Sequence, residues 1–285
     1  MSPRKYLTPV LAVALTMGPI AAHADMTASP SKIISLSPSA TEDLFAIGAG
    51  PQVIAVDDLS NFPANAPVSK LSAYDPNVEA IAAYSPDLVI MNSTATKEAD
   101  VATQLQALGI KVYTEISPNS ISQAYSEISD LGSATGHAAQ ASSVIAGMKG
   151  AIAKIVKGAR KRNPLSFFHE VDNTNYSATS QTFIGHVYSD FNLKNIADGA
   201  KLADASGYPQ LQSEYIIKAN PRLIFLGDAQ YGESAKTVAK RPGWSNISAV
   251  KNKHVIALPA DIPSRWGPRL VDLYRCISTS IAKIS

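Results

Sequence analysis

Side chains that could perform catalysis follow no recognisable pattern in this chain of 285 residues. The sequence has neither the G-x-S-x-G turn of serine hydrolases nor the glycine-rich loops that bind phosphates or dinucleotides, and it has no H-E-x-x-H zinc motif. His169, Glu170 and Asp172 gather ionisable groups after a predicted strand, but their spacing fits no metal site, and such a histidine is usually structural. The sequence therefore predicts no catalytic residue, no metal site, no cofactor and no enzyme activity.

Glu79 and Glu214 occupy equivalent positions in an internal repeat. Each stands seven residues before a proline, Pro86 or Pro221, and each proline precedes an apolar run typical of a buried strand. One interpretation places both glutamates in the first turn of a helix, where the helix dipole favours a negative charge. The other makes them exposed carboxylates, one in each of two similar lobes, that bind arginines of a partner protein. Both interpretations are compatible with the spacing.

Aromatic residues gather in loops that follow predicted strands, namely Tyr74, Tyr176, Tyr208, Tyr231 and Trp266. In an open α/β sheet, ligands bind at the carboxyl ends of the strands, so these loops favour a flat, mainly apolar ligand or a macrocycle. A single loop aromatic more often covers the core. Nearby, Arg265 and Arg269 carry guanidinium groups suited to carboxylate, amide or phosphate groups, although Arg269 could instead open the last helix.

Short apolar runs alternate with helical patterns in the first half of the chain, which is typical of a parallel sheet in an α/β lobe. The apolar runs predict strands at residues 32–36, 53–56, 88–91 and 110–114. Helical patterns fall at residues 41–48, 77–83, 97–108 and 121–132. We expect Ser39 or Thr41 to cap the first helix and Pro86 to end the second.

A long helical pattern from His137 to about Arg160 separates this region from a second one of the same kind. Strands are predicted again at residues 165–168, 223–226 and 255–258, with helices near residues 184–190, 213–219 and 268–283. We therefore expect an α/β fold of two lobes joined by one long connecting helix. The expected boundaries are residues 25–134 for the N-terminal lobe, 135–163 for the connecting helix and 164–285 for the C-terminal lobe.

The N-terminus has the three parts of a secretory signal peptide. Two basic residues precede an apolar stretch at residues 7–20, and small residues stand at Ala22 and Ala24. We expect cleavage after Ala24, so that residues 1–24 are the signal peptide and the mature protein is periplasmic or otherwise extracytoplasmic. An uncleaved anchor is the alternative, although the stretch is shorter than the roughly 20 residues that span a bilayer.

Composition excludes several classes of protein. Hydrophobic residues make up 46% of the chain and charged residues 17%, which is incompatible with wholesale disorder. The formal net charge is only +2 and no basic run follows the first few residues, so no nucleic-acid partner is expected. The one cysteine, Cys276, cannot form an internal disulfide and is expected to be a buried structural thiol.

Several segments together resemble the periplasmic binding proteins for cobalamin, haem and iron–siderophore complexes. The likeness covers nearly all of the mature chain, in order, at residues 33–48 (IISLSPSATEDLFAIG), 79–90, 104–110, 195–197 and 242–244. Members of that family have two lobes joined by one long helix, hold the ligand in the cleft between the lobes and deliver it to an ABC importer. A glutamate on each lobe pairs with transporter arginines, and those glutamates match Glu79 and Glu214.

Within the family, the likeness is closest to the cobalamin-binding member. It implies that aromatic side chains of the cleft are Tyr74, Tyr176 and Tyr208. It also implies that Arg265 is a cleft arginine. Two cleft tryptophans of that member are tyrosines here, Ser180 replaces the glycine that usually follows the Tyr176 segment, and Trp266 takes the place of a small residue.

The sequence therefore predicts a solute-binding protein that captures a metal chelate, foremost cobalamin or a related corrinoid, and delivers it to an ABC permease in the cytoplasmic membrane. Haem is the first alternative ligand, with Tyr74, Tyr176 and His169 as candidate iron ligands. A ferric siderophore, usually held by several arginines, is the second. A secreted enzyme without a recognisable motif and a signalling or adhesion module are the alternatives from other classes.

Overall fold

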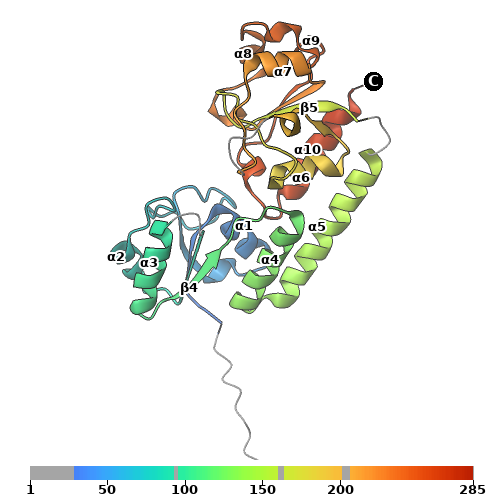
Figure 1. Ribbon diagram of the computed structural model, residues 1–285. Coiled ribbons are helices and arrows are strands. Elements are labelled where there is room, and N and C mark those ends of the chain that lie inside the picture. The colour runs from blue at the N-terminus through green and yellow to red at the C-terminus, as the bar shows by residue number, and fades with distance from the viewer. Residues whose placement is uncertain (1–28, 93–95, 160–163, 201–205, 285) are drawn as a thin grey trace, which may run out of the picture.

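The computed structural model describes residues 29–92, 96–159, 164–200 and 206–284. It consists of two α/β lobes, one above the other in Figure 1, with a long helix along one side. The two lobes predicted from the alternating apolar runs are therefore confirmed. The predicted signal peptide and its cleavage point lie outside the described residues.

The sheet of the N-terminal lobe has four parallel strands in the order β2-β1-β3-β4. Their bounds are Ile33–Leu36 (β1), Val53–Val56 (β2), Leu88–Asn92 (β3) and Lys111–Glu115 (β4). The central strand β1 is apolar in three of its four positions and buried along its whole length, as a parallel strand covered on both faces must be.

The helices of this lobe are Pro38–Ala46 (α1), Val78–Ala82 (α2), Thr96–Ala107 (α3) and Ile121–Thr135 (α4). The predicted start of α1 was wrong, because the helix begins three residues before Thr41. Its N-cap is Ser37, whose hydroxyl accepts a hydrogen bond from the Ala40 amide, and Pro38 fills the first helical position. Proline is favoured there because its missing N–H would have no partner.

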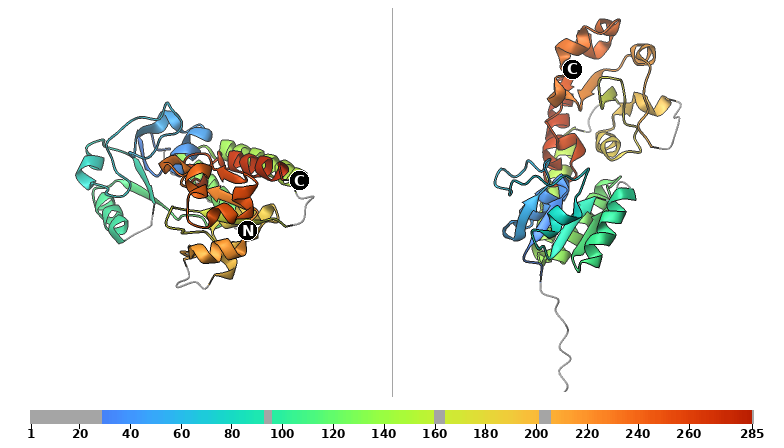
Figure 2. Two further views of the ribbon diagram at one scale, coloured as in Figure 1. Left: turned by 90° about the horizontal axis from the view of Figure 1, so that it is seen from above. Right: turned by 90° about the vertical axis from the view of Figure 1, so that its left-hand side faces the viewer.

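A single helix, α5 (Ala138–Ala159), connects the lobes. The helix before it ends at Gly136, whose φ of 82° lets the chain reverse so that α5 packs back against α4. Its second neighbour is the last helix of the chain, α10 (Leu270–Ala282), and Figure 2 shows α5 and α10 side by side. Among the helices in the described ranges, none is long and apolar enough to cross a bilayer.

The sheet of the C-terminal lobe repeats the first one, with four parallel strands in the order β6-β5-β7-β8. Their bounds are Ser166–Glu170 (β5), Lys194–Asn195 (β6), Leu223–Leu226 (β7) and Val255–Ala257 (β8). The repeat around the two glutamates falls on matching elements, because β3 and β7 occupy the same place in their sheets. The expectation that β5 ends at Phe168 was wrong, since His169 and Glu170 are its last two residues.

Shorter helices cover this second sheet. They are Phe183–Asp190 (α6), Ser213–Ala219 (α7), Ala235–Ala239 (α8) and Ser248–Lys251 (α9). Single 3₁₀ turns occur at Gly50–Gln52, Ile196–Gly199, Ala229–Tyr231, Trp244–Asn246 and Ile262–Ser264.

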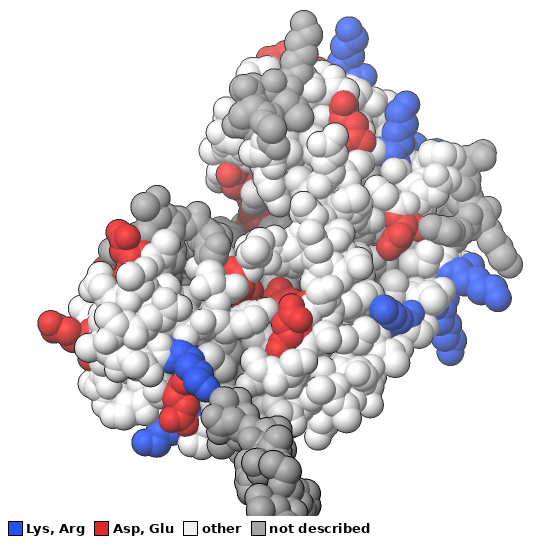
Figure 3. Space-filling model, turned by 60° about the horizontal axis from the view of Figure 1, so that its bottom comes forward, with Lys and Arg blue, Asp and Glu red and all other residues white. Residues whose placement is uncertain are grey.

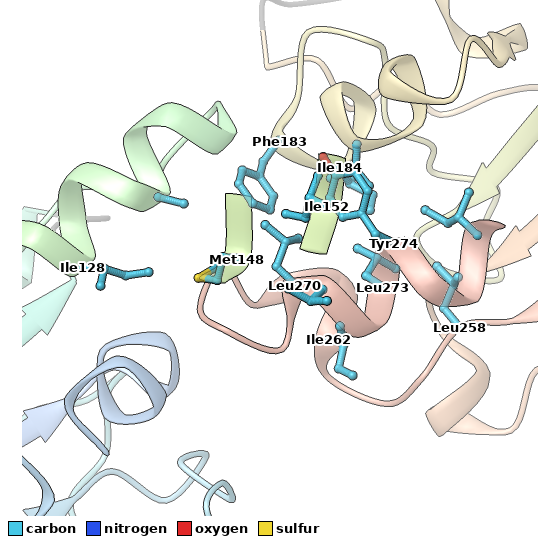
Figure 4. Close-up of a cluster of buried hydrophobic side chains, with 14 of the residues drawn as sticks. Ile128, Met148, Ile152, Phe183, Ile184, Leu258, Ile262, Leu270, Leu273 and Tyr274 are labelled. Carbon is cyan, nitrogen blue, oxygen red and sulfur yellow. The ribbon is translucent and has the colours of Figure 1, made fainter. Parts of the chain in front are cut away.

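One apolar cluster runs through both lobes, and α5 and α10 form its centre. Figure 4 shows Phe183 and Ile184 of α6 lying against Ile152 of α5 and Leu273 of α10. Because the connecting helix is itself part of this core, we expect the lobes to move little relative to each other. Cys276 is only partly buried against the same cluster, and its burial raises the pKa of the thiol.

Candidate ligand-binding cleft

A cavity of about 420 Å³ lies where the two lobes meet. Its walls are Ser117 and Pro118 from the N-terminal lobe and, from the C-terminal lobe, His169, Val171, Phe183, Ile184, Tyr208, Gly227, Gln230, Tyr231, Pro263, Ser264 and Trp266. Among these described lining residues there is no lysine, arginine, aspartate or glutamate. The cavity therefore combines apolar and aromatic surface with neutral hydrogen-bonding groups.

The carboxyl ends of β5 and β7 form the floor of this cavity, as expected for an open parallel sheet. His169 stands one residue before the end of β5, and Gly227 directly follows β7. Helix α6 adds Phe183 and Ile184 from its first turn. The Thr182 hydroxyl caps that turn by accepting a hydrogen bond from the Gly185 amide at 3.1 Å.

His169 is a buried, neutral side chain of the floor. Its side chain reaches the cavity, yet the residue is only 3% exposed, and burial lowers the pKa of its imidazole to about 4. Nδ1 lies 2.9 Å from the hydroxyl of Tyr188, which is fully buried and packs at 4.4 Å between ring centroids on Phe167. The histidine therefore stays uncharged over the physiological pH range.

Trp266 joins the two lobes beside the cavity. Its ring meets Phe183 edge to face, with centroids 6.4 Å apart, and its indole N–H donates a hydrogen bond to Glu115 at 3.3 Å. The indole is thus anchored at one end in the N-terminal lobe while its ring lines the cavity.

The predicted cleft tyrosines differ in where they lie. Tyr208 lines the cavity, as does Tyr231, and Tyr208 remains 44% exposed. Tyr176 lies on a segment bridged to Gln210, next to the segment that carries Tyr208, and is 40% exposed. Tyr74 is 79% exposed in a loop of the N-terminal lobe. Neither Tyr74 nor Tyr176 belongs to the lining, so their contact with a ligand stays a prediction.

The two predicted arginines are turned toward a carboxylate. Arg269 forms a two-pronged ion pair with Glu42 of α1, through Nε at 2.9 Å and through a second nitrogen. The Nε of Arg265 lies 3.9 Å from the same carboxylate, and its side chain is 13% exposed. Arg265 does not line the cavity, but it donates a hydrogen bond at 3.2 Å to the hydroxyl of Ser264, which does. The segment that carries both arginines therefore links the lobes.

Three carboxyl groups pack together beneath Trp266 in the N-terminal lobe: Asp43 of α1, Glu115 of β4 and Glu127 of α4. Both oxygens of Asp43 lack a hydrogen-bond partner in the described part of the chain. Burial, reinforced by Glu115 and then by Glu42, raises the pKa of Asp43 well above its usual range. Burial and Glu115 raise the pKa of Glu127 to about 11. Burial therefore favours the protonated form of Asp43, and Glu127 is protonated at neutral pH.

Glu79 and Glu214 lie in the first turns of α2 and α7, and both are exposed. Figure 1 places these helices far apart, one on each lobe. Glu79 shares a groove with Asp75 and Asp100, whereas the last turn of the helix of Glu214 carries Lys218. On the face shown in Figure 3, charged side chains stand apart on a largely uncharged surface.

Several lining residues were not expected from the sequence. Phe183 and Ile184 belong to a predicted helix and give no separate signal, while Ser117 and Ser264 are ordinary loop residues. Gly227 could have been found, because it directly follows a predicted strand at the edge where ligands bind.

Comparison with known proteins agrees with this architecture. The periplasmic binding protein family matches residues 33–262. An ABC transporter substrate-binding lipoprotein of Bacillus subtilis, itself uncharacterized, is 35% identical and covers 88% of this chain and 80% of its own. A cobalamin-binding protein of Halobacterium salinarum is 27% identical, with 87% and 68% covered. The crystal structure of a possible iron-binding solute-binding protein from Staphylococcus epidermidis superimposes with a TM-score of 0.79, at 27% identity and 90% and 100% coverage.

A two-lobed fold with a cleft between the lobes defines the class of substrate-binding proteins that serve ABC transporters. The chain belongs to the periplasmic binding protein family. The family predicted from the sequence is confirmed, and with it the expectation that this protein is a binding protein of extracytoplasmic location and not an enzyme.

Proposed function

We propose that this protein captures cobalamin or a related corrinoid outside the cytoplasm and delivers it to an ABC importer. The observation that carries the proposal is the uncharged lining of the cleft cavity. The periphery of a corrinoid carries many neutral carboxamides, which suit neutral donors and acceptors such as Gln230, Tyr208 and Ser264. Relatives named as cobalamin-binding proteins support the same ligand class.

The other metal chelates are less well matched to this lining. Haem carries two propionate carboxylates and ferric siderophores usually depend on arginines, but no described lining residue supplies a positive charge. Arg265 is not a lining residue; it donates to Ser264 at 3.2 Å, and its Nε lies 3.9 Å from Glu42. Haem is the second candidate because His169 reaches the cavity, where an imidazole could bind iron.

A corrinoid is larger than the 420 Å³ cavity, so only an edge of the macrocycle enters it. We propose that the remainder lies against the exposed rings of Tyr74, Tyr176 and Tyr208. Aromatic contacts of this kind contribute about 0.5–1.5 kcal/mol each beyond the burial of surface.

Delivery of the ligand to the permease involves the two predicted docking residues. Glu79 and Glu214 present one exposed carboxylate on each lobe, which suits a two-fold symmetric permease with one arginine site per subunit. Such contacts set the orientation of docking more than its affinity. We propose these two glutamates as the transporter-docking residues.

Export depends on the N-terminal signal. We propose cleavage after Ala24, so that the mature protein begins at Asp25. The mass of the exported protein measures this directly. A mass that includes Met1 would show that the segment remains as an anchor.

The absorption spectrum of the protein purified from its native host can identify the bound ligand. Corrinoid, haem and ferric catecholate absorb at different wavelengths. We expect the bands of a corrinoid. A haem Soret band or a catecholate charge-transfer band would overturn the proposed ligand and leave the transport class intact.

A further inference from the structure

The pair of His169 and Tyr188 has a defined proton arrangement. The hydroxyl of Tyr188 is fully buried, and in the described part of the chain its one hydrogen-bond partner is Nδ1 of His169, at 2.9 Å. If Nδ1 carried the proton, the phenolic O–H would be a buried donor without an acceptor, which is costly. The phenol therefore donates to Nδ1, and the imidazole proton resides on Nε2.

The protonated nitrogen faces the ligand cavity. His169 lines the cavity, and its Nε2 has no hydrogen-bond partner among the described residues. Gly227 leaves that edge of the ring open: a Cβ at this glycine would lie 3.4 Å from Cε1 and 3.5 Å from Nε2 of the imidazole. The floor of the cavity thus presents a single neutral N–H donor.

We propose that His169 is a specificity-determining residue that donates a hydrogen bond from Nε2 to a carbonyl oxygen of a peripheral carboxamide of the ligand. This inference rests on the proposed corrinoid ligand. It assigns to the histidine a role different from axial metal coordination, which would require Nε2 without a proton. The position of His169 also disfavours coordination of the metal. The edge of the macrocycle enters the cavity first, whereas the metal lies at the centre of the macrocycle.

The low pKa of His169, about 4, supports a donor whose protonation does not change near neutrality. No Asp, Glu, Lys or Arg joins it among the described lining residues, and Tyr188 is neutral because burial raises the pKa of its phenol. The protonation of His169 should therefore cause no difference in the affinity for a neutral ligand between pH 5.5 and pH 7.5.

The decisive substitution is His169→Phe, which keeps an aromatic ring of similar size and removes the donor. We expect its affinity for cyanocobalamin, measured by calorimetry, to fall about tenfold, while His169→Gln, which retains an N–H donor, recovers part of the loss. His186→Phe is the matched control, because it makes the same change at an exposed histidine of α6 and should leave the affinity unchanged.

Two measurements on the unaltered protein keep the inference testable if the variants fail to fold. The ¹⁵N spectrum should show the proton of His169 on Nε2. Aquocobalamin should bind without the spectral change that imidazole coordination to cobalt produces. A proton on Nδ1, or an imidazole–cobalt spectrum that depends on His169, would overturn the donor role.

The outcomes separate this inference from the function on which it rests. If the unaltered protein and His169→Phe both bind cyanocobalamin with equal affinity, only the inference about His169 is overturned. Failure of the unaltered protein to bind any corrinoid would overturn the proposed ligand and this role of His169 with it.

Discussion

The two lobes have the same strand order, but one buried glutamate in each, Glu170 and Glu127, is neutralised in a different way. In the C-terminal lobe, Glu170 at the end of β5 accepts two hydrogen bonds from Arg241, at 2.6 and 2.7 Å. Burial raises the pKa of Glu170 to about 7, and the guanidinium opposes a larger rise. In the N-terminal lobe, Glu127 has an acidic neighbour instead of a cation, and its pKa rises to about 11. Glu170 is therefore neutralised by a guanidinium and Glu127 by a proton.

The lobes also contribute unequally to the cleft. Only Ser117 and Pro118 of the described lining residues come from the N-terminal lobe, whereas the strand ends and α6 of the C-terminal lobe supply the floor and most of the walls. We infer that the C-terminal lobe sets the ligand chemistry. The N-terminal lobe supplies the acidic cluster that receives the Trp266 indole.

The largest expected effect concerns docking, where the lobes should act together. The double change Glu79→Gln and Glu214→Gln keeps side-chain shape and removes both charges, so uptake into cells should fall to background while ligand affinity and melting temperature stay nearly unchanged. If the glutamates only stabilise their helices, the loss is instead about 0.3–1 kcal/mol of stability per site, with normal uptake.

Single variants sharpen this test because the surroundings differ. Glu79→Gln leaves Asp75 and Asp100 in the same groove, so it should reduce uptake less than Glu214→Gln. Asp130→Asn, which removes an exposed charge from α4, is the control. Uptake at the unaltered level in the double variant would refute the docking assignment.

The next effect concerns the ion pair of the C-terminal lobe. Arg241→Gln leaves the carboxyl group of Glu170 buried without its cation and should lower the free energy of unfolding by about 3 kcal/mol at pH 8. The loss should be smaller at pH 5, where Glu170, with its raised pKa, is protonated. Denaturant unfolding at the two pH values measures it.

The double variant Arg241→Gln and Glu170→Gln serves as the control for this pair. It should recover much of the stability, because no buried charge is left alone. An equal loss at both pH values would mean that Arg241 acts mainly through its packing on Trp244, whose ring lies 4.7 Å from the guanidinium.

A smaller effect is expected at the cleft tyrosines. Changing Tyr74 and Tyr208 together to Ala should weaken ligand binding at least tenfold without unfolding the protein. Because Tyr208 lines the cavity and Tyr74 does not, Tyr208→Ala alone should cause most of the loss. Tyr84→Ala is the matched control, because this exposed tyrosine precedes β3 and lies at the amino ends of the strands, away from the cleft. Unchanged affinity in calorimetry would show that these rings only cover the core.

The smallest effect concerns the proton-neutralised acids of the N-terminal lobe. A group whose folded pKa is raised loses its stabilising contribution as pH rises, here from about 4.5, the usual value for glutamate, toward about 11. Glu127→Gln cannot ionise, so it should stabilise the protein at pH 8, by an amount that grows with pH, and have no such effect at pH 4. Destabilisation at both pH values would indicate a hydrogen bond that glutamine cannot replace.

Most strands were predictable because each is an apolar run bounded by turn residues, and β2 and β7 have the predicted bounds. The omitted elements, β6, α8 and α9, contain two, five and four residues, too few to show a period. The start of α1 carried a signal, since a serine followed by proline is typical of a helix N-terminus.

The site was predictable only where it follows from the ends of strands. Loop position pointed to Tyr208 and Trp266, and both line the cavity. Two hydrogen bonds of the site, between His169 and Tyr188 and between Trp266 and Glu115, join residues distant in sequence. No local sequence pattern predicts them. Arg265 shows the converse: loop position pointed to it, but its side chain donates to Ser264 and does not line the cavity.

The central claim, capture of a corrinoid, is tested most directly by calorimetric titration of the mature protein with cyanocobalamin, haemin and a ferric catecholate siderophore. We expect one cyanocobalamin to bind per chain, at least tenfold more tightly than either iron chelate. Tighter binding of haemin or of the ferric siderophore, or no heat of binding with cyanocobalamin, would contradict the account.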